Sequence, residues 1–207
     1  MPNIFQVRTK PGGVNRVSDF VEKGFVAIGW TETESLEGVD KEGIRERLKQ
    51  LGYEGQQLSN YLGTLNTFVN VMEEGDIVLV ADGDVVHIGI VGPYEWREDL
   101  KDIRCAHYRK CDWKAVVKRS ELNEDVQGLL RSGTTCTKFK YSYEFSGLDK
   151  YLKNEKEGKK EEMDEFQKEL EREALEKAKE LLKSDDERIR LEAVKEILHY
   201  LKDSKDS

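Results

Sequence analysis

The chain contains little of what marks secreted, membrane or metal-binding proteins. It has three cysteines, three prolines and three histidines in 207 residues. Cys105, Cys111 and Cys136 are odd in number and lack a metal-ligand spacing, so reduced thiols in a cytoplasmic protein are expected, without a metal. Apolar runs stay far below the roughly 18 residues of a membrane span. No secretory signal is predicted, because residues 1–4 lead directly into a strand-like segment.

Motifs of common catalytic sites are also missing. The sequence has no G-x-x-x-x-G-K-[ST], G-x-G-x-x-G or H-E-x-x-H. His87 lies in an apolar segment typical of a strand. His107 precedes Cys111 by four residues at an expected loop-to-strand boundary, which gives little support to a thiol nucleophile. The sequence therefore predicts no catalytic residue, no cofactor and no enzymatic activity; an enzyme acting on a nucleotide or small ligand is the weakest alternative.

Charge is plentiful but unevenly distributed. The formal net charge is −8, which argues against a broadly basic nucleic-acid binder. Residues 97–140 hold eleven basic and seven acidic residues, a local net charge of +4, whereas residues 151–207 hold fourteen basic and eighteen acidic residues. A locally positive face can bind phosphate within an acidic protein. An ordinary solvated surface explains the same distribution.

The periodicity of apolar residues predicts short strands interrupted by helices. Strands are expected at 4–8, 25–29, 75–80, 85–92, 111–118 and 137–145, and helices at 14–24, 40–52 and 58–74. The pair Asp82-Gly83 suits a type I′ hairpin turn. Because strands and helices do not alternate regularly, the pattern indicates an α+β fold with a small curved mixed sheet or barrel and flanking helices.

The composition changes near residue 150, which predicts one domain over residues 1–148 and a second segment over 149–207. Residues 153–162 are charged and suit a linker or an exposed helix start. Apolar stripes then predict an αα-hairpin, with a capping box at residues 184–187. Its apolar faces are expected to cover each other, and residues 164–201 are a candidate surface for a protein partner or a second copy.

Aromatic residues are the strongest functional feature. Trp30 ends an apolar strand and opens a polar loop, and Tyr94 and Trp96 follow the predicted hairpin. Rings at strand ends can stack on a nucleobase, and such stacking contributes about 1–3 kcal/mol per base. Ordinary core filling is the alternative for each ring. Trp113, in the middle of a strand, is expected to be structural.

The order of several short segments resembles a known family. These segments include Ile28-Gly29-Trp30, then Gly75-Asp76-Ile77-Val78-Leu79, then Ile88-Gly89-Ile90-Val91-Gly92-Pro93-Tyr94 and Cys111-Asp112-Trp113. Together they resemble the PUA-like domains, of the EVE/YTH type, found at the N-termini of Mrr/McrB-like restriction proteins. The resemblance covers roughly residues 3–145. Unlike those proteins, this chain has only about 57 helical residues after the domain, so any cleavage would have to come from a partner.

The resemblance implies a reader of a modified base in an aromatic cage, in DNA more than in RNA. By that resemblance Trp30 matches the first wall of the cage, and Trp96 or Tyr94 falls in the segment that supplies the other. The residues in the region expected to contact the base edge or the backbone are Arg8, Lys10, Asn15 and Asn66. The residues expected to bind phosphate are Arg97, Arg104, Arg109, Lys110 and Lys138.

Two functions remain open at this point. The first is a non-catalytic module that recognises a methylated adenine or cytosine in nucleic acid, as part of a defence or restriction system. The second is a non-enzymatic adaptor subunit that acts through its C-terminal helices. Truncation after residue 150 discriminates between them, because only the second depends on the helical segment.

Overall fold

A computed structural model describes residues 1–152, 172, 176–177, 179–191 and 193–195. The chain divides into two units, residues 1–152 and residues 153–207. The first unit contains one six-stranded mixed sheet, in the order β2-β5-β4-β3-β1-β6. The strands are β1 (Ile4–Val7), β2 (Phe25–Ile28), β3 (Ile77–Asp82), β4 (Val85–Trp96), β5 (His107–Lys118) and β6 (Cys136–Lys138).

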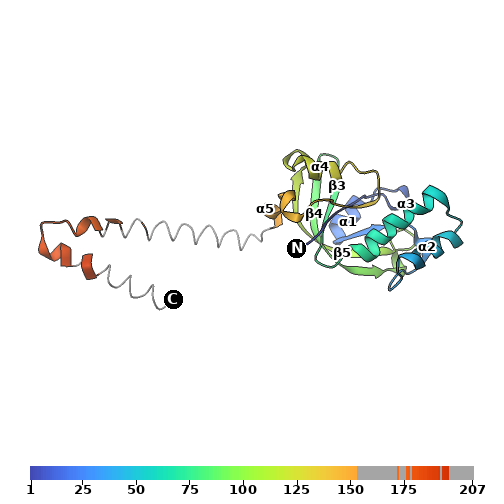
Figure 1. The fold of residues 1–207 in the computed structure, drawn as a ribbon, viewed down its shortest axis with the longest axis horizontal. Coiled ribbons are helices and arrows are strands. Elements are labelled where there is room, and N and C mark those ends of the chain that lie inside the picture. Colours follow the sequence, from blue (N-terminus) through green and yellow to red (C-terminus); the bar gives the residue numbers. More distant parts are fainter. Residues whose placement is uncertain (153–171, 173–175, 178, 192, 196–207) are drawn as a thin grey trace. The chain divides into compact units, whose positions relative to one another are not determined.

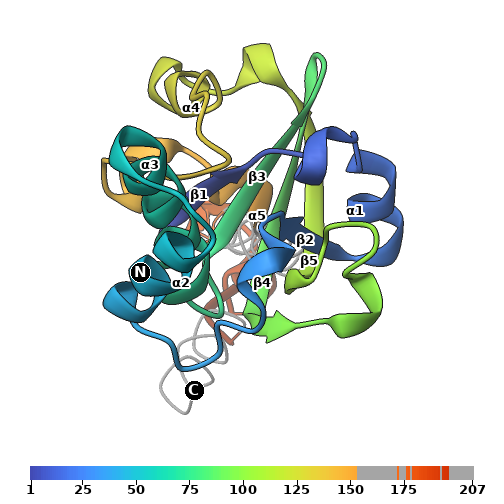
Figure 2. The ribbon, with the colours of Figure 1, turned by 90° about the vertical axis from the view of Figure 1, so that its right-hand side faces the viewer.

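Five α-helices and several short turns of helix accompany the sheet in the first unit. The α-helices are α1 (Val17–Lys23), α2 (Lys41–Gln50), α3 (Gly55–Asn66), α4 (Glu124–Leu129) and α5 (Asp149–Leu152). The shorter turns are Pro11–Gly13, Thr31–Thr33, Glu98–Leu100, Arg119–Glu121 and Tyr143–Ser146, with a π-helical turn at Thr67–Val71. Figure 2 shows α2 and α3 beside each other, with α4 above them.

Local sequence signals explain where several helices begin and end. Asp40 accepts a hydrogen bond from the Gly43 N–H (2.8 Å) at the start of α2, and Asn123 accepts one from Val126 (2.9 Å) at the start of α4. Both are side-chain caps of otherwise unpaired N–H groups. Gly24 ends α1 with a left-handed φ of 66°, which glycine adopts without strain.

The sheet separates two hydrophobic cores, because successive side chains of a strand point to opposite faces. Phe5 and Val78 belong to a larger core with side chains of α1, α2 and α3. Ile4 and Ile77 belong to a smaller core with side chains of α4 and residue 148. All four residues of β2 are buried, as expected for an apolar strand covered on both faces.

The α+β class and the mixed sheet are as predicted, but three details differ. The sheet is open: β2 and β6 form its edges, so the barrel alternative is wrong. The hairpin loop comprises Gly83 and Asp84, with Asp82 paired to Val85, and of these residues only Gly83 has a positive φ. The strand expected at 137–145 stops at Lys138, because the chain then turns into a 3₁₀ helix at Tyr143.

The predicted αα-hairpin lies largely outside the described residues. Helical conformation is described at 179–181, 187–191 and 193–195. In the capping segment, the Asp186 carboxylate accepts a hydrogen bond from the Arg188 N–H (2.8 Å). Within the described part of the chain, no helix is both long enough and apolar enough to cross a bilayer.

Candidate functional site

Trp30 lies at the point where β2 ends and the chain turns sharply. Its φ of 66° and ψ of 35° are left-handed, a conformation that costs a non-glycine residue about 1–2 kcal/mol. The next residues, Thr31–Thr33, form a 3₁₀ turn. The indole is half-buried. Because an unfavourable backbone conformation persists only where its surroundings impose it, the contacts of this turn identify what positions the ring.

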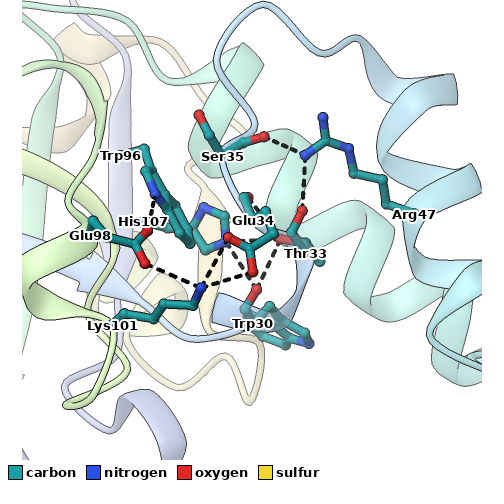
Figure 3. Close-up of polar contacts among 9 residues, drawn as sticks. All are labelled: Trp30, Thr33, Glu34, Ser35, Arg47, Trp96, Glu98, Lys101 and His107. Carbon is teal, nitrogen blue, oxygen red and sulfur yellow. Dashed lines mark hydrogen bonds and ion pairs between the residues drawn. The ribbon is translucent and has the colours of Figure 1, made fainter.

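The main-chain carbonyl of Trp30 is the centre of these contacts. It accepts hydrogen bonds from the Thr33 N–H (3.0 Å) and the Thr33 hydroxyl (2.9 Å). The third contact is to Nε2 of His107, 3.1 Å away on β5. Figure 3 shows His107 and Thr33 converging on this carbonyl. The turn is therefore fixed to the adjacent strand, and the indole with it.

The hydrogen-bond pattern assigns the tautomer of His107. Nδ1 lies 2.9 Å from the Tyr94 hydroxyl, and that hydroxyl oxygen accepts a hydrogen bond from the Leu36 N–H at 3.2 Å. The Tyr94 hydroxyl thus donates to Nδ1, and Nε2 carries the proton that is donated to Trp30. Burial lowers the pKa of His107 to about 4 and raises that of Tyr94 to about 12, so the network is neutral.

Charged side chains hold the rest of the loop. Arg47 of α2 donates to the carbonyls of Thr33 (2.9 Å) and Ser35. Lys101 donates to the Glu34 carboxylate (2.8 Å) and to that of Glu98 (3.3 Å). Figure 3 shows these contacts on two sides of the loop. The loop that presents Trp30 is therefore held by hydrogen bonds and ion pairs within the chain.

Trp30 forms one wall of a hollow of about 280 Å³, here called the aromatic hollow. Tyr61 of α3 lies between two other rings: its centroid is 5.0 Å from that of Trp30, at 65°, and 5.0 Å from that of Tyr53, at 78°. All three rings are half-buried. The aromatic hollow is lined by Lys10, Pro11, Gly12, Gly29, Trp30, Glu32, Tyr53, Tyr61, Arg104 and Thr135.

Polar and charged groups complete the aromatic hollow. Arg104 donates to the Glu32 carboxylate at 3.0 Å. Its stem lies against Gly12, whose φ of 61° is left-handed and therefore favours glycine. Arg104 also has a left-handed φ of 57°. The hollow therefore combines three rings with a carboxylate and two cations, Arg104 and Lys10.

Two further hollows adjoin the aromatic hollow. The wide hollow, of about 620 Å³, lies between α3 and residues 133–138 and shares Trp30, Tyr61 and Thr135 with it. The basic hollow, of about 290 Å³, is lined by residues 6–10, Ala81 and residues 130–133, and shares Lys10 with it. Trp30 lines two of these three hollows, and Lys10 lies at the border of the third. A fourth hollow, of about 600 Å³, lies beside α4 and residues 137–140.

The structure brings five of the residues predicted from the sequence to these hollows. Trp30, Lys10 and Arg104 line the aromatic hollow. Arg8 and Lys10 line the basic hollow. Lys138 lines the wide hollow and the fourth hollow.

Tyr94 and Trp96 do not face Trp30 across a hollow, which corrects the expectation that one of them forms the second wall. The Tyr94 hydroxyl is engaged with His107 and Leu36. The Trp96 indole packs edge-on against His107, with ring centroids 5.1 Å apart, and donates to Glu98 (2.9 Å). Neither residue lines any of the four hollows. Both rings instead pack around the imidazole that positions Trp30.

Arg109 has a structural position that is incompatible with the predicted phosphate contact. Its side chain is 2% exposed. It donates to the carbonyls of Phe68 (3.0 Å), Val69 (3.2 Å), Met72 (2.6 Å) and Gly92 (2.8 Å). Burial lowers the pKa of its guanidinium to about 10. Arg109 thus donates to two carbonyls of the π-helical turn, to that of Met72 directly after it, and to that of Gly92 in β4.

The remaining predicted residues lie outside the four hollows. Arg97 forms a two-pronged ion pair with Asp99 (2.7 and 2.8 Å). Lys110 is exposed on β5. Asn15 is exposed and accepts a hydrogen bond from the Val17 N–H (3.4 Å). Asn66 is half-buried on α3 and accepts one from Asn70 (3.2 Å). Tertiary packing does not bring these four side chains to Trp30.

The three cysteine thiols are not suited to act as nucleophiles, because burial favours their protonated form. Burial raises the pKa of Cys105 to about 11 and that of Cys136 to about 12, and it raises the pKa of Cys111 further still. Nucleophilic cysteines instead have lowered pKa values. All three thiols are free and buried. Among the described residues, no group of three or more His, Cys, Asp or Glu side chains is placed to hold a metal ion.

Sequence reasoning missed the two tyrosines of the aromatic hollow. Tyr61 borders the apolar stripe of α3 formed by Leu58, Leu62 and Leu65, and it contacts the core from the edge of that stripe. Tyr53 precedes α3 directly. The available signal was a tyrosine beside the stripe rather than within it. Its pairing with Trp30, which lies on a different element, depends on how α3 packs.

Comparison with known proteins identifies the family of this chain. Residues 10–140 match the family model described as a domain of unknown function (DUF8426). The chain belongs to this family. The matched residues include Trp30, both tyrosines and the segment 133–138, so the aromatic hollow lies within the family domain. No curated protein and no solved structure matches the chain.

Proposed function

We propose that residues 1–152 form a non-catalytic module that binds nucleic acid and recognises a modified base, a methylated adenine or cytosine, in the aromatic hollow. The observation that supports this proposal most directly is that Trp30, Tyr61 and Tyr53 line a single hollow, with Trp30 held by the hydrogen bonds of its own turn. A planar base gains affinity by stacking on such rings, by about 1–3 kcal/mol per base. A methyl group on the base adds apolar surface that the rings can cover.

The size of the aromatic hollow suits one base. Its volume of about 280 Å³ is just below the roughly 300–1,000 Å³ typical of small-molecule pockets, as expected for a ligand as small as one base. A base extruded from its strand needs a hollow of about its own size, together with polar partners for its Watson–Crick edge. Glu32 offers an acceptor for an exocyclic amino group, and Arg104 and Lys10 offer donors. Tyr61 and Tyr53 take the stacking role that Tyr94 and Trp96 have in the sequence-based hypothesis.

The fold is consistent with this proposal at a coarser level. An open mixed sheet with hydrophobic cores and helices on both faces is compatible with a PUA-like domain of the EVE/YTH type, and we keep that assignment as part of the proposal. A place in a defence or restriction system follows from the same resemblance. A partner would then supply any cleavage, since the proposed module binds and does not cut.

Binding of modified oligonucleotides tests the proposal. Single-stranded oligonucleotides of one sequence, carrying N6-methyladenine, 5-methylcytosine or no modification, are titrated with the full chain and followed by fluorescence anisotropy. We expect tighter binding of one modified strand, and loss of that preference in Trp30→Ala and Tyr53→Ala. Trp96→Phe, which changes a ring outside the four hollows, is the matched control. Equal affinity for all three strands would refute base recognition.

A second candidate function is an adaptor role for the C-terminal unit. Four of its described apolar side chains are exposed: Leu181, Ile189, Leu191 and Val194. Exposed apolar side chains mark a candidate surface for a partner or a second copy. A chain truncated after residue 152, compared with the full chain by light scattering, tests this candidate. If the adaptor role is correct, the truncated chain loses self-association or partner capture and keeps its affinity for oligonucleotides.

A further inference from the structure

The basic hollow holds three cations and no carboxylate. Arg8, Lys10 and Arg131 are exposed and line it, and the other lining residues are neutral. Within the described residues, none of the three cations forms a salt bridge. By contrast, Arg104 and Lys101 near Trp30 are each paired with a carboxylate. An unpaired cluster of cations beside the aromatic hollow is suited to an anionic group.

Gln6 adds an unpaired hydrogen-bond acceptor to the basic hollow, whereas the three cations are donors. Its side chain is 3% exposed and lines the basic hollow. Nε2 donates to the carbonyl of Thr134 at 3.2 Å, which fixes the orientation of the amide. Oε1 is buried and has no hydrogen-bond partner among the described residues. A buried acceptor without a donor is destabilising, so this oxygen is suited to a ligand that brings a donor.

Hydrogen bonds within the chain hold the wall of the basic hollow. Arg8 pairs with the loop 132–135 twice, through its N–H to the Thr135 carbonyl (2.9 Å) and through its guanidinium to the Gly133 carbonyl (2.8 Å). The hydroxyls of Ser132 and Thr137 lie 2.9 Å apart. These contacts hold the loop against β1. The guanidinium of Arg8 keeps further N–H groups for a ligand, since only one of its nitrogens contacts Gly133.

We propose that the basic hollow binds the sugar–phosphate backbone of an RNA strand: the cations hold a phosphate, and Gln6 Oε1 accepts a hydrogen bond from the adjacent ribose 2′-hydroxyl. This inference rests on the proposed function. Lys10 lines both hollows, so a base in the aromatic hollow would have its sugar and phosphate near the basic hollow. A DNA backbone offers only acceptors here, whereas RNA supplies a donor next to its phosphate. The inference reverses the expectation from sequence that DNA is favoured.

The test compares three backbones of one base sequence, each with the modified base that the wild-type chain prefers. Ribose supplies a hydroxyl donor, deoxyribose supplies none, and 2′-O-methylribose keeps the oxygen but removes the donor. We expect the wild-type chain to bind the ribose strand about 3- to 10-fold more tightly than either other strand, the factor for one neutral hydrogen bond. Equal binding of all three strands overturns the inference.

Variants separate the two parts of the basic hollow. Gln6→Leu removes the orphaned acceptor at similar volume and is expected to abolish the preference for ribose while keeping the preference for the modified base. Arg131→Ala is expected to weaken all three strands and to lower the slope of log K against log salt by about 0.7. Lys41→Ala, an exposed cation at the start of α2, is the charge-matched control. A ribose preference retained in Gln6→Leu, or equal slopes for Arg131→Ala and Lys41→Ala, contradicts the inference.

Failure of this inference is distinguishable from failure of the proposed function. A chain that prefers the modified base on every backbone alike supports the aromatic hollow and rejects the role of Gln6. A chain that prefers ribose strands but does not distinguish modified from unmodified bases supports the role of Gln6 and rejects base recognition in the aromatic hollow. Absence of binding to any strand overturns both. Thermal unfolding verifies each variant; Gln6→Met replaces Gln6→Leu if the leucine variant does not fold.

Discussion

The buried imidazole of His107 donates from Nε2 to the main-chain carbonyl of Trp30 across 3.1 Å, and thereby supports a tryptophan in a left-handed backbone conformation. His107 lines none of the four hollows. Its contribution to any ligand is therefore through the position of the indole. The neighbouring rings of Tyr94 and Trp96 pack around the same imidazole. The stability of this loop should consequently depend on the protonation of one side chain.

Acid should destabilise the domain through His107. Burial depresses its pKa from 6.5 to about 4 in the folded chain, so the unfolded chain binds more protons between these values. Stability from the neutral imidazole is fully present above pH 6.5 and is lost as the pH falls toward 4, by up to about 3 kcal/mol. Urea unfolding at several pH values, compared between wild type and His107→Gln, measures this. The variant should lack that part of the pH dependence; identical pH profiles would contradict the assignment.

Two substitutions of Trp30 should separate backbone strain from stacking. Glycine adopts a left-handed φ without strain, whereas alanine does not, so Trp30→Gly should be more stable than Trp30→Ala by about 0.5–1 kcal/mol. Both variants lose the indole and should lose the preference for a modified base equally. Thermal unfolding and oligonucleotide titration give the two readouts. A Trp30→Ala variant as stable as Trp30→Gly would show that this conformation is not a source of strain.

Tyr53 and Trp96 should differ in their effect on binding, although both are half-buried aromatic residues. Tyr53→Ala removes a ring of the aromatic hollow and should weaken binding of the modified strand by about 5- to 100-fold, the equivalent of about 1–3 kcal/mol of stacking. Trp96→Ala removes a ring that packs on His107 and should lower the thermal midpoint instead. Anisotropy titrations at a temperature where both variants are folded make the comparison. A larger loss of affinity in Trp96→Ala would support the sequence-based assignment of the second wall.

Arg109 should behave as a core residue. Arg109→Met leaves four buried carbonyls without their donors and should cost about 4 kcal/mol or more in the free energy of unfolding. Arg109→Lys should also be destabilising, since three donors on one atom cannot replace a planar guanidinium. Lys110→Ala, the exposed neighbour on β5, should change stability by less than about 0.5 kcal/mol. Urea denaturation measures all three, and a stable Arg109→Met with weakened oligonucleotide binding would restore the phosphate role.

The aromatic hollow was only half visible in the sequence. Trp30 is recognisable because an indole follows an apolar strand and precedes a polar loop, a local pattern. Tyr61 and Tyr53 carry no such mark, because they border a helix whose apolar stripe is fully explained by leucines. Arg109 shows the reverse problem: in sequence it is one of several cations, and only the packing of β5 against β4 and the end of α3 gives its guanidinium four carbonyls.

The sequence by itself determined the α+β class, most of the strands and helices, and the position of Trp30 at a strand end, because periodicity, caps and glycine positions act over a few residues. The tertiary structure alone decided which rings share a hollow with Trp30, which cations are buried or paired, and that Gln6 keeps an unsatisfied oxygen. These outcomes depend on contacts between elements far apart in the chain, such as α3 with the turn after β2, or β1 with residues 132–135. Short-range patterns do not encode such distances, so the site emerges only when the sheet and its helices pack.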